Sequence, residues 1–197
     1  MSQPTPAFAA WQAELLHNSA PPFKMRPMPG QDREVKFCFL AQPTDVNFGG
    51  KVHGGMVMKW IDQAGYACAV GWSGKYCVTV AVGGIRFVHP ILIGDMVTVH
   101  CQLIYTGNTS MHFCVDVIAR RLETSEETLA THCVIVMVAT DDAGKPTPAP
   151  AWEPQSADDK ALAAYAQKLM ELDKNIAQEI ARYRDAAHLP LPSPRPN

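Results

Sequence analysis

The sequence carries little net charge, and this argues against one large class of function. Its 17 lysine and arginine residues are nearly balanced by 19 acidic residues, so the formal net charge is -2. The basic residues are also scattered along the chain. Proteins that bind nucleic acid concentrate basic residues on one surface, and we therefore expect no nucleic-acid partner.

Long apolar runs are missing as well. No uninterrupted hydrophobic stretch approaches the roughly 20 residues of a membrane-spanning helix. The first residues, MSQPTPAFAAWQAELLHNSA, have neither the basic start nor the continuous apolar segment of a secretory signal. We expect a cytoplasmic protein that has no membrane partner.

The cysteines and histidines form no recognisable metal motif. No pair has the CxxC spacing, and no cysteine lies in a group with histidines at zinc-finger spacing. Most of the cysteines follow apolar patterns, which is typical of buried thiols in a reducing compartment. We expect no metal site, and a disulfide framework is the weaker alternative. The cysteines are Cys38, Cys68, Cys77, Cys101, Cys114 and Cys133.

Regular hydrophobic patterns begin near residue 34 and predict an α+β fold in which one long helix packs against an antiparallel sheet. Residues 1–34 form an N-terminal extension with a short helix over 9–16, residues 35–150 form the main domain, and residues 151–197 form a C-terminal helix with a disordered proline-rich tail. The expected strands are 34–41, 76–88, 96–106, 111–123 and 129–142, and the expected helices are 56–72 and 157–187. A double glycine, Gly83–Gly84, predicts a bulge in the second strand.

One helix can cover only one face of the sheet. The expected strands carry Val78, Val80, Val97, Val99 and Val115, and we do not expect the helix to bury all of them. Uncovered sheet faces and edges favour self-association, so the sequence predicts an oligomer.

The stretch NFGGKVHGGMVMKWID places Gly54 and Gly55 where a loop becomes a helix. Their N–H groups lack helical partners, and the helix start carries partial positive charge, so they could hold a developing oxyanion. A phosphate cradle is less consistent because no GK[ST] follows. A tight turn that only permits close packing remains an equal alternative.

Asp62 lies in the otherwise apolar helix that follows. A carboxylate there is costly unless it is paired or reaches a cleft. One alternative places it on a narrow polar face with Lys59, Gln63 and Tyr66, where it is paired with Lys59 or simply solvated. The other makes it a general base or nucleophile that faces a pocket. Asp62 lies about 10 Å along the helix from Gly55, so one carbonyl cannot contact both in one helix. A catalytic role for both requires a dimer. His53 more often orders such a loop, with substrate contact as the alternative.

Three motifs in the same order resemble those of hotdog-fold acyl-CoA thioesterases, namely the bacterial acyl-CoA hydrolases and the cytosolic tandem-domain hydrolase of animals. They are PTDVNFGGKVHGGMVMKWIDQAG, VTVAVGGIRFVHPILIGDMV and YTGNTSM, and the resemblance covers residues 35–148. It implies a hotdog fold, in which the antiparallel sheet wraps around the long central helix. It also implies a homo-oligomer built from dimers, often three of them.

The resemblance also implies roles for residues. Asp62 matches the catalytic acidic residue, Asn47 matches an asparagine that acts from the partner subunit, and the Gly55 N–H matches the group that holds the thioester oxygen. His53 and Gly54 are candidate substrate contacts beside them. The turn Thr106, Gly107, Asn108, Thr109 and Ser110, and the pair Arg120 and Arg121, match segments near the nucleotide of coenzyme A. An ordinary turn and surface arginines are the alternative for these last two groups.

The resemblance implies hydrolysis of acyl-CoA, with coenzyme A as part of the substrate and no separate cofactor. Gly83–Gly84 and Arg86 depart from the family pattern, so the substrate preference does not transfer. A non-catalytic acyl-CoA or lipid-binding protein is the main alternative. A hotdog dehydratase is less consistent, because such enzymes usually pair a histidine with an acidic residue and His53 does not supply that pair within its helix.

Overall fold

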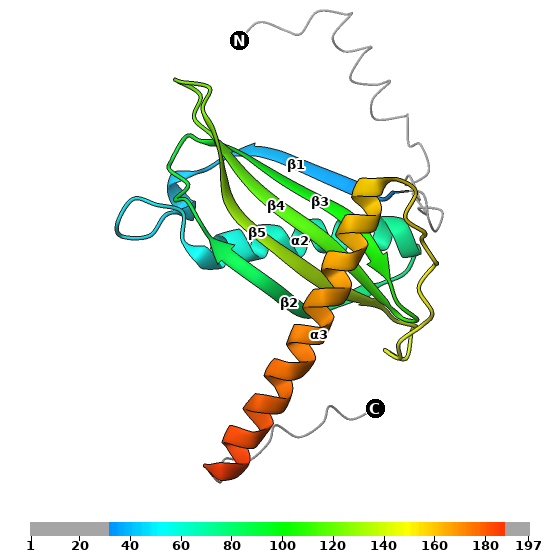
Figure 1. Ribbon diagram of the computed structural model, residues 1–197. Coiled ribbons are helices and arrows are strands. Elements are labelled where there is room, and N and C mark those ends of the chain that lie inside the picture. The colour runs from blue at the N-terminus through cyan, green and yellow to red at the C-terminus, as the bar shows by residue number, and fades with distance from the viewer. Residues whose placement is uncertain (1–31, 188–197) are drawn as a thin grey trace, which may run out of the picture.

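The computed structural model describes residues 32–187, which form one curved antiparallel sheet with a helix on each face (Figure 1). The strand order is β1-β3-β4-β5-β2, and every neighbouring pair is antiparallel. The predicted short helix over 9–16, most of the N-terminal extension and the proline-rich tail lie outside the described residues. The elements are β1 (Glu34–Leu40), the short 3-10 helix η1 (Pro43–Asp45), α2 (Gly54–Ser73), β2 (Cys77–Phe87), β3 (Met96–Thr106), β4 (Ser110–Arg120), β5 (Glu127–Ala139) and α3 (Ala157–Ala186).

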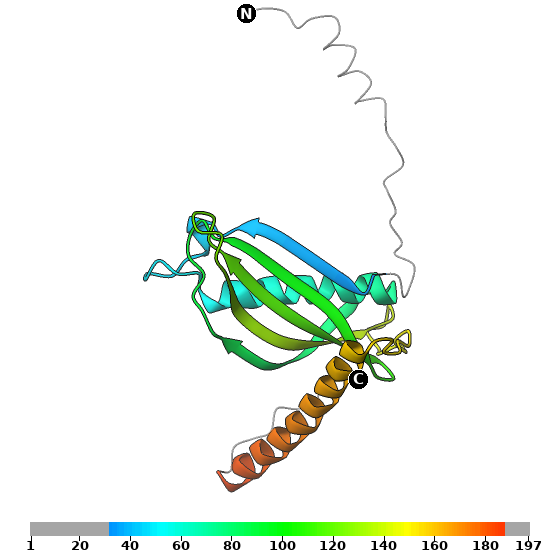
Figure 2. The ribbon, with the colours of Figure 1, turned by 45° about the horizontal axis from the view of Figure 1, so that its top comes forward.

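Helix α2 lies in the curve of the sheet, as Figure 2 shows from a second direction. Its apolar residues recur on nearly every side, so packing against the concave face buries most of them. Ile61, Ala64, Cys68 and Ala69 are fully buried there. The sheet wrapped around one long helix is the hotdog arrangement, and the predicted fold is confirmed.

One detail of the prediction needs correction. Helix α2 begins at Gly54, two residues before the predicted start, because His53 caps it. The expectation that the helix does not bury all five valines is confirmed. Val97, Val99 and Val115 are fully buried in the core beneath α2, whereas Val80, on β2, is clearly exposed. The predicted bulge is present, because the pairing of β2 with β5 shifts register after Gly83.

Helix α3 crosses the outer face of the sheet, opposite α2 (Figure 1). Its first half packs on a second, smaller core of Ile104, Cys114 and Val134, with Ala166 of α3 fully buried among them. The sheet therefore separates two apolar layers. Within residues 32–187, no helix is long and apolar enough to cross a bilayer.

Candidate active site

The start of α2 presents backbone donors to solvent. His53 has extended backbone, and its Nδ1 accepts a hydrogen bond from the Met56 N–H at 3.0 Å. The Gly54 and Gly55 N–H groups, by contrast, have no hydrogen-bond acceptor among residues 32–187. His53 thus orders the loop, as expected for its position. The free donors at the positive end of the helix dipole can hold a carbonyl oxygen as it gains charge.

The loop before α2 holds Asn47 in a fixed orientation. Asn47 Oδ1 accepts hydrogen bonds from the Gly49 N–H at 2.9 Å and the Lys51 N–H at 3.4 Å. The Asn47 N–H also donates a hydrogen bond to the Lys51 carbonyl at 2.8 Å. Because the oxygen is engaged in the loop, the two amide hydrogens remain as outward donors. Asn47 can therefore donate to a water molecule or to a carbonyl.

A pocket of about 440 Å³ adjoins this helix start. Its walls come mainly from the 47–54 loop, from Phe87 at the end of β2 and from the segment 88–91 that follows, and they include Asn47 and Gly54. The Phe87 ring lies 3.5 Å from the place that a Cβ on Gly54 would occupy. A side chain at position 54 would thus contact the ring and narrow the pocket. The absence of a Cβ lets a ligand approach the backbone donors.

Asp62 lies on the exposed side of α2, where Lys59, Gln63 and Tyr66 are exposed as well. Its Oδ1 accepts a hydrogen bond from the Thr79 hydroxyl on β2. This bond fixes the carboxylate, and none of residues 32–187 donates a hydrogen bond to its second oxygen. Asp62 is not in the wall of the pocket at the start of α2. The structure therefore keeps Asp62 apart from Asn47 and Gly55 within one chain.

Comparison with known proteins places this arrangement in a family. The thioesterase superfamily matches residues 49–125. The acyl-CoA thioester hydrolase YciA of Salmonella typhimurium is 32% identical over 120 residues, which cover 59% of this chain and 90% of that protein. The chain belongs to the thioesterase superfamily.

Two solved structures of this superfamily show the same fold over most of their length. An apo-hexameric acyl-CoA thioesterase superposes with a TM-score of 0.72 at 32% identity, covering 76% of this chain and 96% of that one. An acyl-CoA hydrolase from Staphylococcus aureus, in complex with butyryl coenzyme A and coenzyme A, gives a TM-score of 0.71 at 25% identity. That match covers 82% of this chain and 98% of the other, so it extends well beyond the residues of the superfamily match.

The nucleotide contacts expected in this thioesterase-superfamily protein lie at opposite ends of the sheet. The turn 106–110 joins β3 to β4, and Arg120 ends β4 ten residues after Ser110. At ~3.3 Å per residue, the two groups are roughly 30 Å apart. They cannot contact one nucleotide within one protomer, so their joint role stays a prediction that needs two chains.

Each of these two groups also has structural partners in the thioesterase chain. Thr106 Oγ1 accepts a hydrogen bond from the Trp152 N–H at 3.0 Å, and the Asn108 carbonyl accepts one from the Ala149 N–H at 2.9 Å. Arg121 pairs with the buried Asp95 at 3.6 Å. The turn and the arginine pair therefore stabilise the fold, whether or not they also contact a ligand.

Sequence reasoning missed two residues of the site. Thr79, which holds Asp62, and Phe87, which borders Gly54, both lie on β2. A polar signal existed for Thr79, because it is a threonine between two valines in the apolar first half of the strand. Its partner could not be inferred, since the register of β2 against α2 decides which side chain reaches Asp62.

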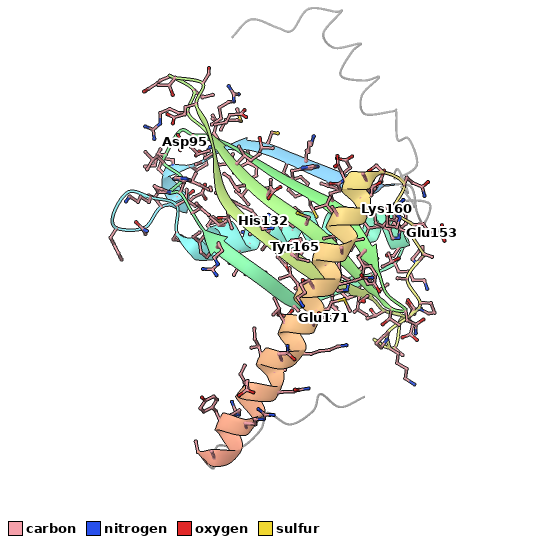
Figure 3. The ribbon with its side chains drawn as sticks, in the orientation of Figure 1. Asp95, His132, Glu153, Lys160, Tyr165 and Glu171 are labelled. Atoms are coloured by element: carbon pink, nitrogen blue, oxygen red, sulfur yellow. The ribbon has the colours of Figure 1, made fainter. Side chains whose placement is uncertain are left out.

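A second polar group lies under α3, on the face of the sheet opposite the site. His132 Nδ1 donates to Asp116 Oδ1 at 2.6 Å, and Cys114 is adjacent. The Nε2 atom of His132 lies 3.1 Å from Tyr165 Oη, and Figure 3 labels these two residues. The Asp116 hydrogen bond, with a further contribution from Cys114, raises the pKa of His132 to about 11. A charged histidine bound this closely to a carboxylate leaves no gap for an ion between them. The group therefore fastens α3 to the sheet.

Proposed function

We propose that this protein is an acyl-CoA thioesterase, which hydrolyses acyl-CoA to a free carboxylic acid and coenzyme A. The observation that carries the proposal is the exposed Asp62 carboxylate, held by Thr79 on a helix whose other faces are packed. The names of the relatives support the substrate class, since YciA of Salmonella typhimurium is an acyl-CoA thioester hydrolase. The Staphylococcus aureus hydrolase, which binds butyryl coenzyme A, supports it as well.

In the proposed reaction, the thioester carbonyl lies against the Gly55 N–H of one subunit. Asp62 of the other subunit removes a proton from water, and the water oxygen attacks the carbonyl carbon. The negative charge moves to the carbonyl oxygen, where the Gly55 N–H and the positive helix start stabilise it. When the carbon–oxygen double bond forms again, the carbon–sulfur bond breaks and coenzyme A leaves as its thiolate. Asn47 donates to the water or to the carbonyl from the Gly55 side.

A direct attack by Asp62 is the second route. The carboxylate oxygen would bond to the carbonyl carbon, expel the coenzyme A thiolate and form a mixed anhydride, which water then cleaves. If water cleaves the anhydride at the Asp62 carboxyl carbon, oxygen from solvent enters Asp62 after one turnover, whereas the general-base route leaves Asp62 unlabelled. Hydrolysis in heavy-oxygen water followed by mass spectrometry of the protein distinguishes them.

The proposal includes a homo-oligomer built from dimers, because each site takes groups from two chains. Hexameric assembly of the thioesterase with the matching fold supports three such dimers. No separate cofactor has a role in this chemistry. The proposal also includes a cytoplasmic location, which the free and mostly buried cysteines support.

Within the chain, we assign catalysis to residues 35–150. Residues 1–34 and 151–197 are extensions outside the hydrolytic unit. The turn 106–110 and the pair Arg120 and Arg121 are proposed to contact the nucleotide of coenzyme A from different protomers, as their separation requires. His53 and Gly54 would contact the thioester end of the substrate.

The first experiment measures release of coenzyme A thiol from a panel of acyl-CoA esters of different chain length. We expect turnover on at least one ester, and we expect Asp62→Asn to reduce it by about 10²–10⁴. Gln63→Asn changes the neighbouring exposed position of α2 and is the matched control. Binding of acyl-CoA without thiol release from any ester would contradict hydrolysis, and wild-type turnover by Asp62→Asn would contradict the role of Asp62.

The second experiment tests whether one site takes residues from two chains. Asp62→Asn and Asn47→Ala protomers, inactive alone, are co-expressed with different tags, and the mixed oligomers are purified. A mixed dimer has one site with both changes and one intact site, so purified mixed dimers should regain about half of wild-type turnover, and hexamers whose dimers formed at random about one quarter. If both residues serve the same chain, no mixture regains activity.

A further inference from the structure

Helix α3 is longer than the surface that its own chain offers. Its first half packs Leu162, Tyr165 and Leu169 on the outer face of the sheet. Its second half carries four large apolar residues that remain exposed. In this distal stripe, Leu172 is 45% exposed, Ile176 55%, Ile180 52% and Tyr183 75%.

The distal stripe continues the face that docks on the sheet. From Leu169 onward, the apolar residues recur at intervals of three or four residues, which keeps them on one side of a helix. The stripe therefore faces the level of the sheet rather than the solvent above it. Because this apolar face of the helix continues beyond the edge of its own sheet, it predicts that a second surface packs against it at the level of the sheet.

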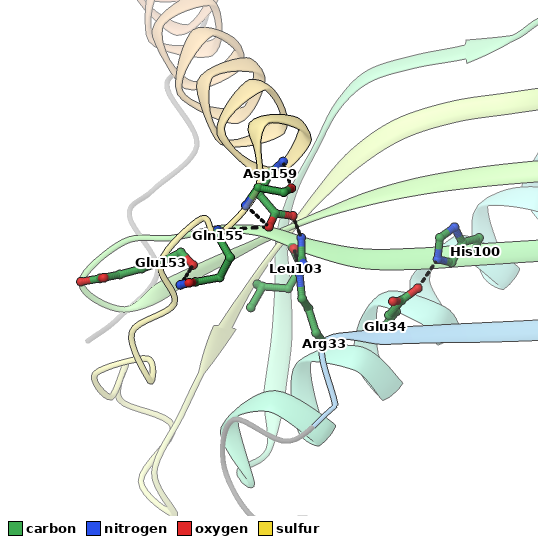
Figure 4. A network of polar contacts seen from close by, with 8 residues as sticks. Arg33, Glu34, His100, Leu103, Glu153, Gln155 and Asp159 are labelled. Carbon is green, nitrogen blue, oxygen red and sulfur yellow. Dashed lines mark hydrogen bonds and ion pairs between the residues drawn. The ribbon is translucent and has the colours of Figure 1, made fainter.

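The direction of α3 is fixed at two points. Near its start, Asp159 accepts hydrogen bonds from the backbone N–H groups of Gln155 and Ser156 and pairs with Arg33 (Figure 4). The Ser156 N–H bond, followed by the Arg33 contact and the Gln155 N–H bond, lowers the pKa of Asp159 to about 2. One third of the way along, Tyr165 contacts His132 (Figure 3). The distal half is thus a straight continuation of an anchored helix.

The helix leaves its own sheet at β2. The place that a Cβ on Gly83 would occupy lies 3.3 Å from Asp173 Oδ2, so α3 passes over β2 near residue 173. Among residues 32–187, β2 has a strand partner only on its β5 side and ends the sheet. Residues 174–186 extend ~20 Å past this edge at ~1.5 Å per residue. Neighbouring strands are ~4.8 Å apart, so this length corresponds to several more strands.

We propose that the distal stripe docks on a second copy of this chain, across the open edge of β2. In a two-fold dimer the same edge meets itself, and a second sheet continuing from β2 would place its outer face directly beneath the stripe. Each α3 would then lie on its partner's sheet beside the partner's own α3. Val80, exposed at the β2 edge, would be covered by the same contact.

The charges of α3 favour a protein surface over a lipid surface. Helices that lie on membranes carry a polar face rich in lysine and arginine. The polar residues of α3 are balanced instead, with six acidic and five basic side chains over Ala157–Ala186. The stripe therefore has no electrostatic attraction to an anionic bilayer.

This interface rests on the dimer of the proposed function, but it makes no use of the catalytic residues. The test is the double change Ile176→Gln with Ile180→Gln in the full chain, followed by sedimentation velocity over a dilution series. We expect the dimer dissociation constant to rise by at least about tenfold, while helical circular dichroism is retained. The matched control, Leu122→Gln with Leu129→Gln, removes two equally exposed leucines and should leave the constant unchanged.

Several results would overturn the proposal. An unchanged dimer constant in the double variant does so directly. Loss of binding to anionic vesicles without a change in mass would assign the stripe to a membrane. A lower unfolding midpoint that does not depend on concentration would assign it to a segment of the same chain. Splitting of a hexamer into stable dimers would place the contact elsewhere than at the β2 edge.

If the double variant unfolds, Tyr183→Gln provides the second measurement, because Tyr183 lies farthest along the helix and is the most exposed of the four. It should raise the dissociation constant in the same direction by a smaller factor. Thiol release is recorded for every variant at high concentration, where dimers persist. Normal turnover with an unchanged constant contradicts the interface alone, whereas absence of turnover in the wild type contradicts the function alone.

Discussion

Helices α2 and α3 pack on opposite faces of one sheet and use their residues in opposite ways. Helix α2 is surrounded, with half of its residues buried and its few exposed polar positions on one side. Helix α3 touches the sheet along its first half and leaves large apolar residues exposed along its second half. The two helices are supported by the same five strands, yet one is enclosed and the other is open.

The difference shows which residues of each helix are not explained by packing or by solvent exposure. On α2, where packing explains almost every apolar side chain, the unexplained residue is a polar one, Asp62. On α3, where solvent explains the polar side chains, the unexplained residues are apolar. Function is therefore inferred from a carboxylate on the enclosed helix and from a hydrophobic stripe on the open one.

The largest expected effect compares the buried contacts of the two helices. Ile61 of α2 is fully buried, so Ile61→Ala should lower the free energy of unfolding by about 2–5 kcal/mol. Leu169 of α3 is half-buried in the smaller core, and Leu169→Ala should cost about 1–2 kcal/mol. Urea denaturation at one protein concentration, followed by tryptophan fluorescence, measures both. Equal costs would show that α3 is as firmly enclosed as α2.

The second effect concerns the charged pair that fastens α3. Asp116, then Cys114, raises the pKa of His132 to about 11. Because the folded pKa exceeds the unfolded value of about 6.5, the stabilisation is complete below pH ~6.5 and is lost as the pH rises toward 11. His132→Gln should therefore cost about 1–2 kcal/mol at pH 6, after allowance for partial exposure. The cost should shrink steadily as the pH is raised.

Urea denaturation of the His132→Gln variant and the wild type between pH 6 and pH 10 measures this difference. His100→Gln, which removes a half-exposed pair with Glu34 away from α3, is the control. A cost that stays constant across this range would mean that the histidine acts through packing rather than through its charge.

The fold was predictable because each element buries a local pattern. The apolar run of α2, the alternation in the strands and the spacing of Leu162, Tyr165 and Leu169 are all visible within a few residues. Asp62 stood out for the same reason, since a carboxylate in an apolar helix requires an explanation, and its catalytic role stays a prediction. The start of α2 was placed two residues late because the capping by His53 depends on a side-chain bond.

The contacts that could not be predicted from the sequence depend on strand register. Thr79 reaches Asp62 from 17 residues away, and His132 meets Asp116 because β4 and β5 pair those two positions. A shift of one residue in the strand register would turn the Thr79 and His132 side chains to the opposite face of the sheet. The length of β4 likewise separates the turn 106–110 from Arg120, which motif matching alone had placed near one nucleotide.

A third effect concerns the exposed side of α2. Thr79→Val keeps the shape of the side chain but removes the hydroxyl that holds Asp62. We expect turnover to fall by about tenfold, equivalent to ~1.4 kcal/mol of the barrier, with little change in KM. Thr79→Ser retains the hydroxyl and should restore most of the turnover. Thr98→Val, on β3, is the matched control, and equal losses in both valine variants would remove Thr79 from the positioning of Asp62.

The smallest effect separates the two anchors of α3. Tyr165→Phe removes only the hydroxyl that lies 3.1 Å from His132 Nε2, and the ring keeps its place in the smaller core. Loss of this one hydrogen bond should cost about 0.5–1 kcal/mol, and the cost should fall at high pH together with that of His132→Gln. The double variant Tyr165→Phe with His132→Gln should therefore lose less unfolding free energy than the two single variants lose together. Strict additivity would mean that Tyr165 holds α3 independently of the charged pair, leaving the Arg33–Asp159 contact as the polar anchor that fixes the direction of the helix.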